Sequence, residues 1–312
     1  MHSISPYTIR CFDPENKKNK LPDYCKLEDI RGNDLYLILK SFLEGASDGR
    51  IKRIEEEKRS YYFSGLVCDD ERRELSCCMM SGFYGVGTDI VNIESGETVF
   101  KKGVKNSDMI QYYVHFFIPR GCNEAICIMS TFRGDGIKTV FLSEFSEFFR
   151  GRVPLALSMN PLSYDKALVE WQDAVAKEIK VVKFNAVKAL EDVEVNGGHF
   201  EPTLVMKPER RRNFGPFKNF FQPETEQAKL VEILTPMGEQ IKTVVQLGDR
   251  KRVFRVGQVN DNVVCQIDVP PEVEQVDGMP KLDSIRKWSS GIIAEFCKNL
   301  YPGVRIYYEC KD

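Results

Sequence analysis

The chain has 312 residues, of which 42% are hydrophobic and 29% are charged, and its formal net charge is −2 at pH 7. This composition is typical of a folded globular protein of one or two domains and excludes disorder on a large scale. The small net charge excludes a generic polycation, so any contact with nucleic acid must come from a local basic patch.

The sequence indicates a cytoplasmic protein without membrane insertion. No stretch approaches the roughly 18 to 20 consecutive apolar residues that a spanning helix needs, and residues 1–6 show no basic leader followed by an apolar run. The cysteines are scattered, without a Cys-x-x-Cys pair or a histidine close enough to complete a zinc site. We therefore expect mostly buried free thiols, no metal and no cofactor.

The first part of the chain predicts one helix followed by a sheet. Residues 1–26 are expected to form a strand and an exposed loop, and a helix capped by Asp29 or Asn33 follows and ends at Gly45. From about residue 60 the apolar period changes to two, which predicts strands. The expected strands are 61–67, 74–81, 88–93, 98–100, 111–118 and 124–131.

Short turns between these strands predict an antiparallel meander, in which residues 88–100 form a hairpin around a polar, Gly-containing turn. A helix at 138–149 is expected to cover the sheet, followed by a strand at 154–159. A second long helix starts at Ser163 and carries apolar residues at helical spacing to Ile179, while residues 179–184 alternate and fit a strand instead.

The remaining chain predicts a joint and a smaller unit. Proline and glycine punctuate the joint, and four short strands are expected at 229–234, 241–247, 251–256 and 262–269. A helix at 283–300 is expected to close this unit, with a last strand at 304–308. The predicted fold is α+β: domain 1–195 is an antiparallel meander covered by helices, 196–227 is the joint, and 228–312 is a small β-rich unit closed by an amphipathic helix.

The glycine-rich residues 82–87 follow a predicted strand, as a phosphate-binding loop would. They match neither dinucleotide nor P-loop spacing, and strands rather than a helix follow. A bulge or tight turn in the sheet is therefore the favoured interpretation.

The basic and aromatic run at 207–221 is the strongest candidate for function. Arginines contact phosphate, and interleaved phenylalanines stack on unpaired bases in proteins that bind single strands. The predicted binding residues, with a second basic cluster, are Lys207, Arg210, Arg211, Arg212, Phe214, Phe217, Lys218, Arg250, Lys251 and Arg252. A solvated face, a contact with an acidic partner, or a linker anchored by its phenylalanines would explain the same run.

Enzymatic chemistry is less well supported, since no catalytic motif is readable. Glu178 and Lys180 match the minimal Glu-x-Lys text of an Mg²⁺-dependent nuclease, as do residues 56–58, but that text is common in charged chains. His115 and His199 are the plausible bases for acyl transfer, although His115 lies in a predicted strand among aromatics, where a structural histidine is usual.

Three short stretches carry a resemblance to known proteins. Residues 81–85, residues 203–210, and residues 266–269 with 277–280 resemble uncharacterised proteins encoded in bacterial anti-phage defence islands. The resemblance implies a sensor or effector subunit that works with a partner during phage infection, and it carries over no catalytic residues.

Together these features predict a non-enzymatic binding protein, a nucleic-acid-binding sensor or effector subunit in prokaryotic anti-phage defence. Its expected partners are DNA or RNA together with a protein partner or further copies of the same chain. The alternative is a protein-interaction or oligomerisation subunit of a multi-component system, with the aromatics of residues 110–150 partly at an interface. The second alternative is the Mg²⁺-dependent nuclease.

Overall fold

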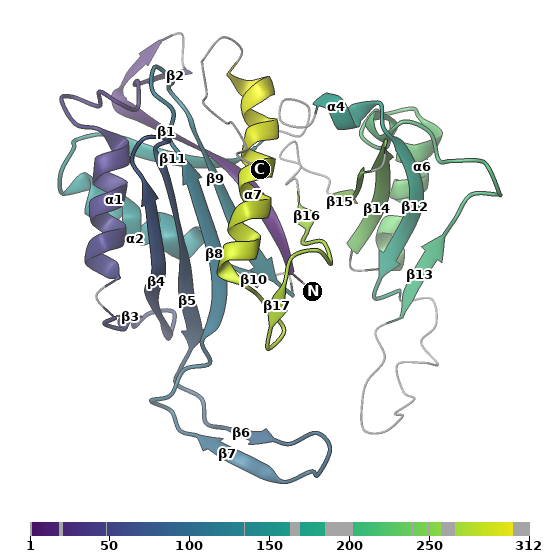
Figure 1. Cartoon of the computed structure of the whole chain (residues 1–312), viewed down its shortest axis with the longest axis horizontal. Coiled ribbons are helices and arrows are strands. Elements are labelled where there is room, and N and C mark those ends of the chain that lie inside the picture. The colour runs from purple at the N-terminus through teal and green to yellow at the C-terminus, as the bar shows by residue number, and fades with distance from the viewer. Residues whose placement is uncertain are drawn as a thin grey trace.

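The computed structural model describes residues 2–18, 21–47, 49–133, 135–162, 169–184, 202–238, 240–248, 250–256 and 266–301. A large antiparallel sheet dominates it, with the strand order β13-β12-β14-β15-β16-β1-β9-β8-β5-β4-β3, as Figure 1 shows. Strands β2, β10 and β11 branch from this path. The mixture of helices and strands around an antiparallel sheet confirms the predicted α+β class.

The first half of the sheet is built by the amino-terminal part of the chain. Its strands are β1 (His2–Lys18), β2 (Leu21–Tyr24), β3 (Lys52–Ile54), β4 (Arg59–Asp69), β5 (Glu74–Phe83), β8 (Ile110–Phe117), β9 (Ala125–Phe132), β10 (Asp135–Gly136) and β11 (Ala156–Pro161). Residues 74–81 of β5 pair directly with residues 110–117 of β8, and β9 lies between β8 and β1.

Both faces of this half are buried, because successive side chains of a strand point to opposite faces. Leu75, Val114 and Cys127 face a core that they share with α1 (Leu35–Ala46) and α2 (Lys138–Arg150). Tyr113 and Ile126 on the neighbouring positions belong to a second core on the other face. Few polar residues therefore lie on the central strands β5, β8 and β9.

Helix α1 begins one residue later than a cap at Asn33 would place it, and five later than a cap at Asp29. The carboxylate of Asp34, rather than Asn33 or Asp29, caps it by accepting a hydrogen bond from the backbone N–H of Tyr36 at 2.8 Å. Its side chain also accepts two hydrogen bonds from the buried guanidinium of Arg73, each 2.7 Å long. The cap therefore ties the helix to the turn between β4 and β5.

The second half of the sheet contains β12 (Val175–Val182), β13 (Thr203–Met206), β14 (Gln240–Leu247), β15 (Arg250–Val256) and β16 (Ile267–Asp268). Helices α4 (Val169–Gln172) and α6 (Glu226–Leu234) accompany it, with short 3₁₀ turns η1 (Phe217–Phe220) and η2 (Thr235–Met237). Strand β16 links the halves, since Ile267 lies opposite both Phe254 of β15 and Ile4 of β1.

Two predicted elements in this half are wrong. Residues 229–234 form the end of helix α6 rather than a strand, because the Thr225 hydroxyl caps the helix by accepting from the N–H of Ala228 at 3.2 Å. The long helix expected to run to Ile179 is helical only at Val169–Gln172 within the described residues, and Val175–Val182 is a strand. Residues 163–168, the first half of the predicted strand 262–269 (residues 262–265) and all of 304–308 lie outside the described part.

Helix α7 (Leu282–Leu300) does not close a separate carboxy-terminal unit as expected. It lies on strands β5 and β8 of the first half, as Figure 1 shows, after the small hairpin β17 (Gln275–Val276) and β18 (Met279–Pro280). Its residues Ile292 and Phe296 share the second core with Trp171 and Phe254 of the other half. The helix therefore contributes to a core common to both halves.

No helix in the described ranges combines the length and apolar character needed to cross a membrane. The cysteines in those ranges are free thiols, as the scattered spacing predicted. Burial raises the pKa of the Cys11 thiol to about 12 and raises that of Cys127 as well, so these groups are protonated at neutral pH.

Candidate interaction surfaces

The cations of the predicted basic run lie on the surface, and three of them are ion-paired. Lys207 Nζ lies 3.3 Å from Glu178 Oε1, and Lys218 Nζ lies 2.6 Å from Asp173 Oδ1. Arg212 pairs with Glu209 three residues earlier. Pairs as exposed as these contribute little to stability and exchange readily with solvent or ligand.

Arg210 and Arg211 are exposed, and neither has an ion-pair partner within the described ranges. Arg211 adopts a positive φ of 69°, as befits its position in a turn. Within the run, these two guanidinium groups are therefore the ones open to an anionic ligand.

The phenylalanines of the same run are anchors of the core. Phe217 is fully buried, and its ring centroid lies 4.6 Å from that of Phe254. Phe214 is half-buried against the second core, and its backbone N–H donates to the carbonyl of Ala176 in β12. The stacking role expected of Phe217 would require its ring to leave this core, so the linker-anchor interpretation explains it better.

The second basic cluster, Arg250, Lys251 and Arg252, also combines a largely buried side chain with an exposed one. Arg252 is largely buried, lies 2.5 Å from Glu295 of α7 and stacks over the ring of Trp171 at 4.8 Å. This side chain fastens β15 to α7 and is not available to a phosphate. Lys251 is exposed, and the side chain of Arg250 lies outside the described part.

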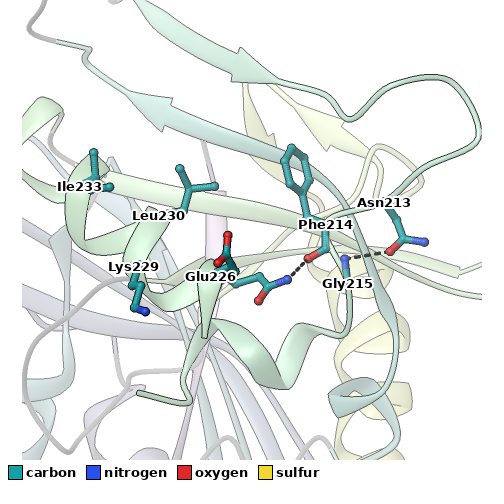
Figure 2. Close-up of a pocket in the computed structure, with 8 residues that line it drawn as sticks. Asn213, Phe214, Gly215, Glu226, Lys229, Leu230 and Ile233 are labelled. Atoms are coloured by element: carbon teal, nitrogen blue, oxygen red, sulfur yellow. Dashed lines mark hydrogen bonds between the residues drawn. The ribbon is translucent and has the colours of Figure 1, made fainter. Parts of the chain in front are cut away.

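An open groove of about 620 Å³ lies between residues 213–215 of the basic run and helix α6 (Figure 2). Phe214, Leu230 and Ile233 supply its apolar wall, and Glu226 and Lys229 of α6 lie at its edge. The Gln227 side chain donates to the Phe214 carbonyl at 2.7 Å, which fixes the run against α6. Both charge signs are present, so the groove itself is not an anion site.

A buried chain of polar groups joins β5, β8 and α7. His115 Nε2 lies 3.1 Å from Glu74 Oε2, and His115 Nδ1 lies 2.9 Å from the Ser289 hydroxyl. The Tyr113 hydroxyl lies 3.0 Å from the same serine oxygen, and burial raises the pKa of Tyr113 so that it remains protonated. The order carboxylate–histidine–serine is that of a nucleophilic relay.

This relay is closed to substrate, since Ser289 is fully buried and His115 is 1% exposed. The serine hydroxyl is also engaged by the carbonyl of Arg286. The arrangement therefore holds α7 on the sheet, which agrees with a structural histidine at position 115. His199, the other base considered, lies outside the described residues.

Glu178 and Lys180, the residues of the predicted nuclease site, do not form a metal-binding arrangement. Glu178 Oε2 lies 3.8 Å from Lys180, and both side chains are on β12. In the described ranges, no three His, Cys, Asp or Glu side chains come together as a metal site would require. The pair is a simple surface contact along one strand.

The most exposed apolar surface lies elsewhere, on residues 83–105, which we call the arm. It projects from the body as the hairpin of β6 (Thr88–Val91) and β7 (Thr98–Lys102), confirming the predicted hairpin (Figure 1). More than half of the exposed large apolar side chains in the described ranges lie on it. They are Phe83, Val86, Ile90, Val91, Ile93, Val99, Phe100 and Val104.

The root and the tip of the arm are well defined. At the root, Gly82 has the Asp108 carbonyl so close that an added Cβ would lie 1.7 Å from its oxygen, and Gly85 has a φ of +98°. At the tip, the Asn92 side chain accepts from the N–H of Glu94 at 2.8 Å, and Gly96 turns the chain. The glycine-rich residues 82–87 thus shape the root of the arm, consistent with a turn rather than a phosphate loop.

The sequence placed a possible interface on the aromatics of residues 110–150, and this is wrong for the aromatic side chains that fill the cores. Tyr112, Phe116, Phe141, Phe145 and Phe149 are each at most 3% exposed. They fill the core between the sheet and α1 and α2. The sequence predicted the hairpin of the arm but not its exposure, because alternating apolar residues fit a core strand and an exposed one equally well.

Comparisons of the chain with protein-family models, with curated proteins and with solved structures found no match.

Proposed function

We propose that this chain is a protein-binding subunit that contacts its partner through the arm. The observation that carries the proposal is the concentration of exposed apolar side chains on residues 83–104, among them Ile93 at 97% exposure. Large contiguous apolar patches on soluble proteins mark interaction sites. The alternative of an interaction subunit is thereby preferred over the nucleic-acid reading.

The arm is not required by the fold. Ser81 of β5 pairs with Ile110 of β8, so the two strands are already neighbours where the chain leaves the sheet. Antiparallel neighbours are normally joined by two to about five residues. The longer insertion therefore contributes nothing to the pairing of β5 with β8, which supports a role outside the fold.

The charges of the arm favour a protein over a nucleic acid. Asp89, Glu94 and Glu97 balance Lys101, Lys102 and Lys105, so the arm offers no net positive field to a phosphate backbone. Mixed charge around an apolar centre is the usual composition of a protein interface.

The test is site-specific photocrosslinking of the full chain in the cells where it occurs. A photoreactive phenylalanine analogue replaces Ile93 on the arm or, as the control, Leu37 of α1, which is 60% exposed. We expect a discrete protein adduct from position 93 that is lost when Phe100→Ser is added, and none from position 37. Equal adduct yields from both positions would refute the proposal.

A second candidate function, nucleic-acid binding, rests on Arg210 and Arg211, two exposed cations of the basic run that have no ion-pair partner in the described ranges. Lys207 and Lys218 flank them in exposed pairs that a phosphate can displace. The test is binding of labelled single-stranded and double-stranded DNA and RNA at low and high salt. Binding that weakens steeply with salt, and is lost in the Arg210/Arg211/Arg212→Ala variant, is expected, and unchanged binding in that variant would exclude this site.

The resemblance to anti-phage defence-island proteins supports a setting in which such a subunit acts during infection. Phage challenge of cells carrying the chain with intact or Phe100→Ser arms tests this setting. Equal plaque formation with and without the chain would remove it.

A further inference from the structure

The two edges of the arm differ in how well they are protected against pairing with another strand. Strand β7 carries the exposed Lys101, and the register shifts between Ile90 and Val91 so that Val99 is an extra residue on β7. Edge lysines and bulges are the common devices that block strand addition. Strand β6 has neither device, and Asp89 is its one charged residue.

The polar backbone groups of β6 also have an orientation suited to a second strand. The Asn92 N–H donates to the Glu97 carbonyl inside the hairpin at 2.9 Å. Because N–H groups alternate along an antiparallel strand, those of Val91 and Asp89 point away from β7. In the described part of the chain, β6 and β7 pair only with each other. The outer edge of β6 is therefore unpaired.

We propose that β6 pairs antiparallel with β6 of a second copy of this chain, with Ile90 of one copy opposite Ile90 of the other. This deepens the proposed function, on which it rests, by naming the partner. The two hairpins then form one four-stranded sheet around a two-fold axis. Such an isologous contact closes at two subunits.

The register follows from hydrogen bonding and charge. With Ile90 on the axis, Asp89 of each copy faces Val91 of the other, so their outward N–H and C=O groups form two hydrogen-bonded pairs. Thr88 faces Asn92, and no like charges lie opposite each other along β6. The Ile90 side chains meet at the centre, each beside Phe100 of its own hairpin.

The alternative addition of β6 onto β7 is disfavoured by the bulge at Val99. It would also be a head-to-tail contact, which does not close and gives chains of increasing length. The two modes therefore differ in the size of the assembly.

The test uses charge exchange at the two-fold axis, with the mass of the full chain measured by light scattering and sedimentation over a range of concentrations. Ile90→Lys and Ile90→Glu each place like charges opposite each other, and each is expected to weaken dimerisation about fivefold. An equimolar mixture of the two variants is expected to restore the dimer, because lysine then faces glutamate. Val99→Lys on β7, where the native side chain is 68% exposed, is the matched control and is expected to leave the dimer intact.

A monomeric native chain, larger species that grow with concentration, or a mixture that stays monomeric would each overturn the pairing. So would loss of the dimer in Val99→Lys. A monomer whose arm still crosslinks to a different protein in the photocrosslinking test would overturn the second copy as partner and leave the proposed function standing. A monomer without any arm adduct would remove both.

Discussion

Replacing Ser289 with alanine should loosen helix α7 from the sheet. The serine is fully buried, and its hydroxyl lies 2.9 Å from His115 Nδ1 and 3.0 Å from the Tyr113 hydroxyl. Alanine removes the hydroxyl and adds no group that can replace it. The histidine nitrogen is then left in the core without its partner.

The size of the effect follows from burial. A buried polar group that loses its hydrogen bond destabilises the folded state by about 1–3 kcal/mol. Tyr113 also hydrogen-bonds the Ser76 side chain, so most of the loss falls on His115. Alanine is a better helix former than serine by a few tenths of a kcal/mol, which offsets a small part. We expect Ser289→Ala to lower the free energy of unfolding by about 2 kcal/mol.

The control is Ser290→Ala, the same exchange at the next residue of α7, which is partly exposed. Helix propensity changes equally in both variants, so their difference isolates the buried hydroxyl. Urea unfolding, followed by far-UV and near-UV circular dichroism, measures the free energy of unfolding of each variant. If Ser289→Ala lies within about 0.5 kcal/mol of Ser290→Ala, the hydroxyl does not hold the helix and the reasoning is refuted.

Three further changes test the fold. Gly82→Ala should lower the free energy of unfolding, because the added Cβ would collide with the Asp108 carbonyl. Gly45→Ala is the control and should be neutral or stabilising, because there is open space around that residue. Equal urea midpoints for the two variants would contradict this expectation. Arg252→Ala should lower the free energy of unfolding by about 2–4 kcal/mol, because the largely buried Glu295 carboxylate loses its ion pair with Arg252, whereas Lys251→Ala should have no measurable effect. Burial raises the pKa of the Cys77 thiol, so this thiol remains protonated at pH 8. Peptide mapping after alkylation should find Cys77 labelled only when the protein is unfolded in denaturant. Labelling of Cys77 in the native state would contradict its burial.

Much of the first half of the sheet could be predicted from the sequence. The sequence predicted strands at 74–81, 111–118 and 124–131. Strand β5 covers the first of these ranges, and β8 and β9 cover the other two apart from one residue at an end of each. The reason is that alternation persists even where both faces are buried, since polar positions such as Ser76 and His115 interrupt the apolar residues on one face.

Elements whose environment is set by distant residues could not be predicted in the same way. The pattern of α7 indicates an amphipathic helix but not the sheet that it covers. That choice depends on Ser289 meeting His115, and on Arg286 donating to Ser76 at 2.9 Å, across most of the chain. Residues 229–234 are compatible with both periods, and the Thr225 cap that decides for a helix lies outside that window.

The candidate binding residues show the same limit. Arginine and phenylalanine in one run suit both a nucleic-acid surface and an anchored linker, and sequence alone does not give burial. The contact of Phe217 with Phe254, and the backbone bonds of the run to β12, place the aromatics in the core. The cations of the run that have no ion-pair partner in the described ranges, Arg210 and Arg211, could be identified only after their neighbours had been assigned partners.

The distribution of covered and open surfaces points again to the arm. One face of the first half of the sheet is covered by α1 and α2, and the other by α7 and the shared core. The faces of the central strands in that half are thus already occupied, which leaves the sheet edges and the arm for pairing with a further strand. An isolated two-stranded hairpin is marginally stable in water, and adding strands to it increases its stability. Pairing through β6 would therefore stabilise the arm itself and bury apolar side chains that the body of the protein leaves exposed.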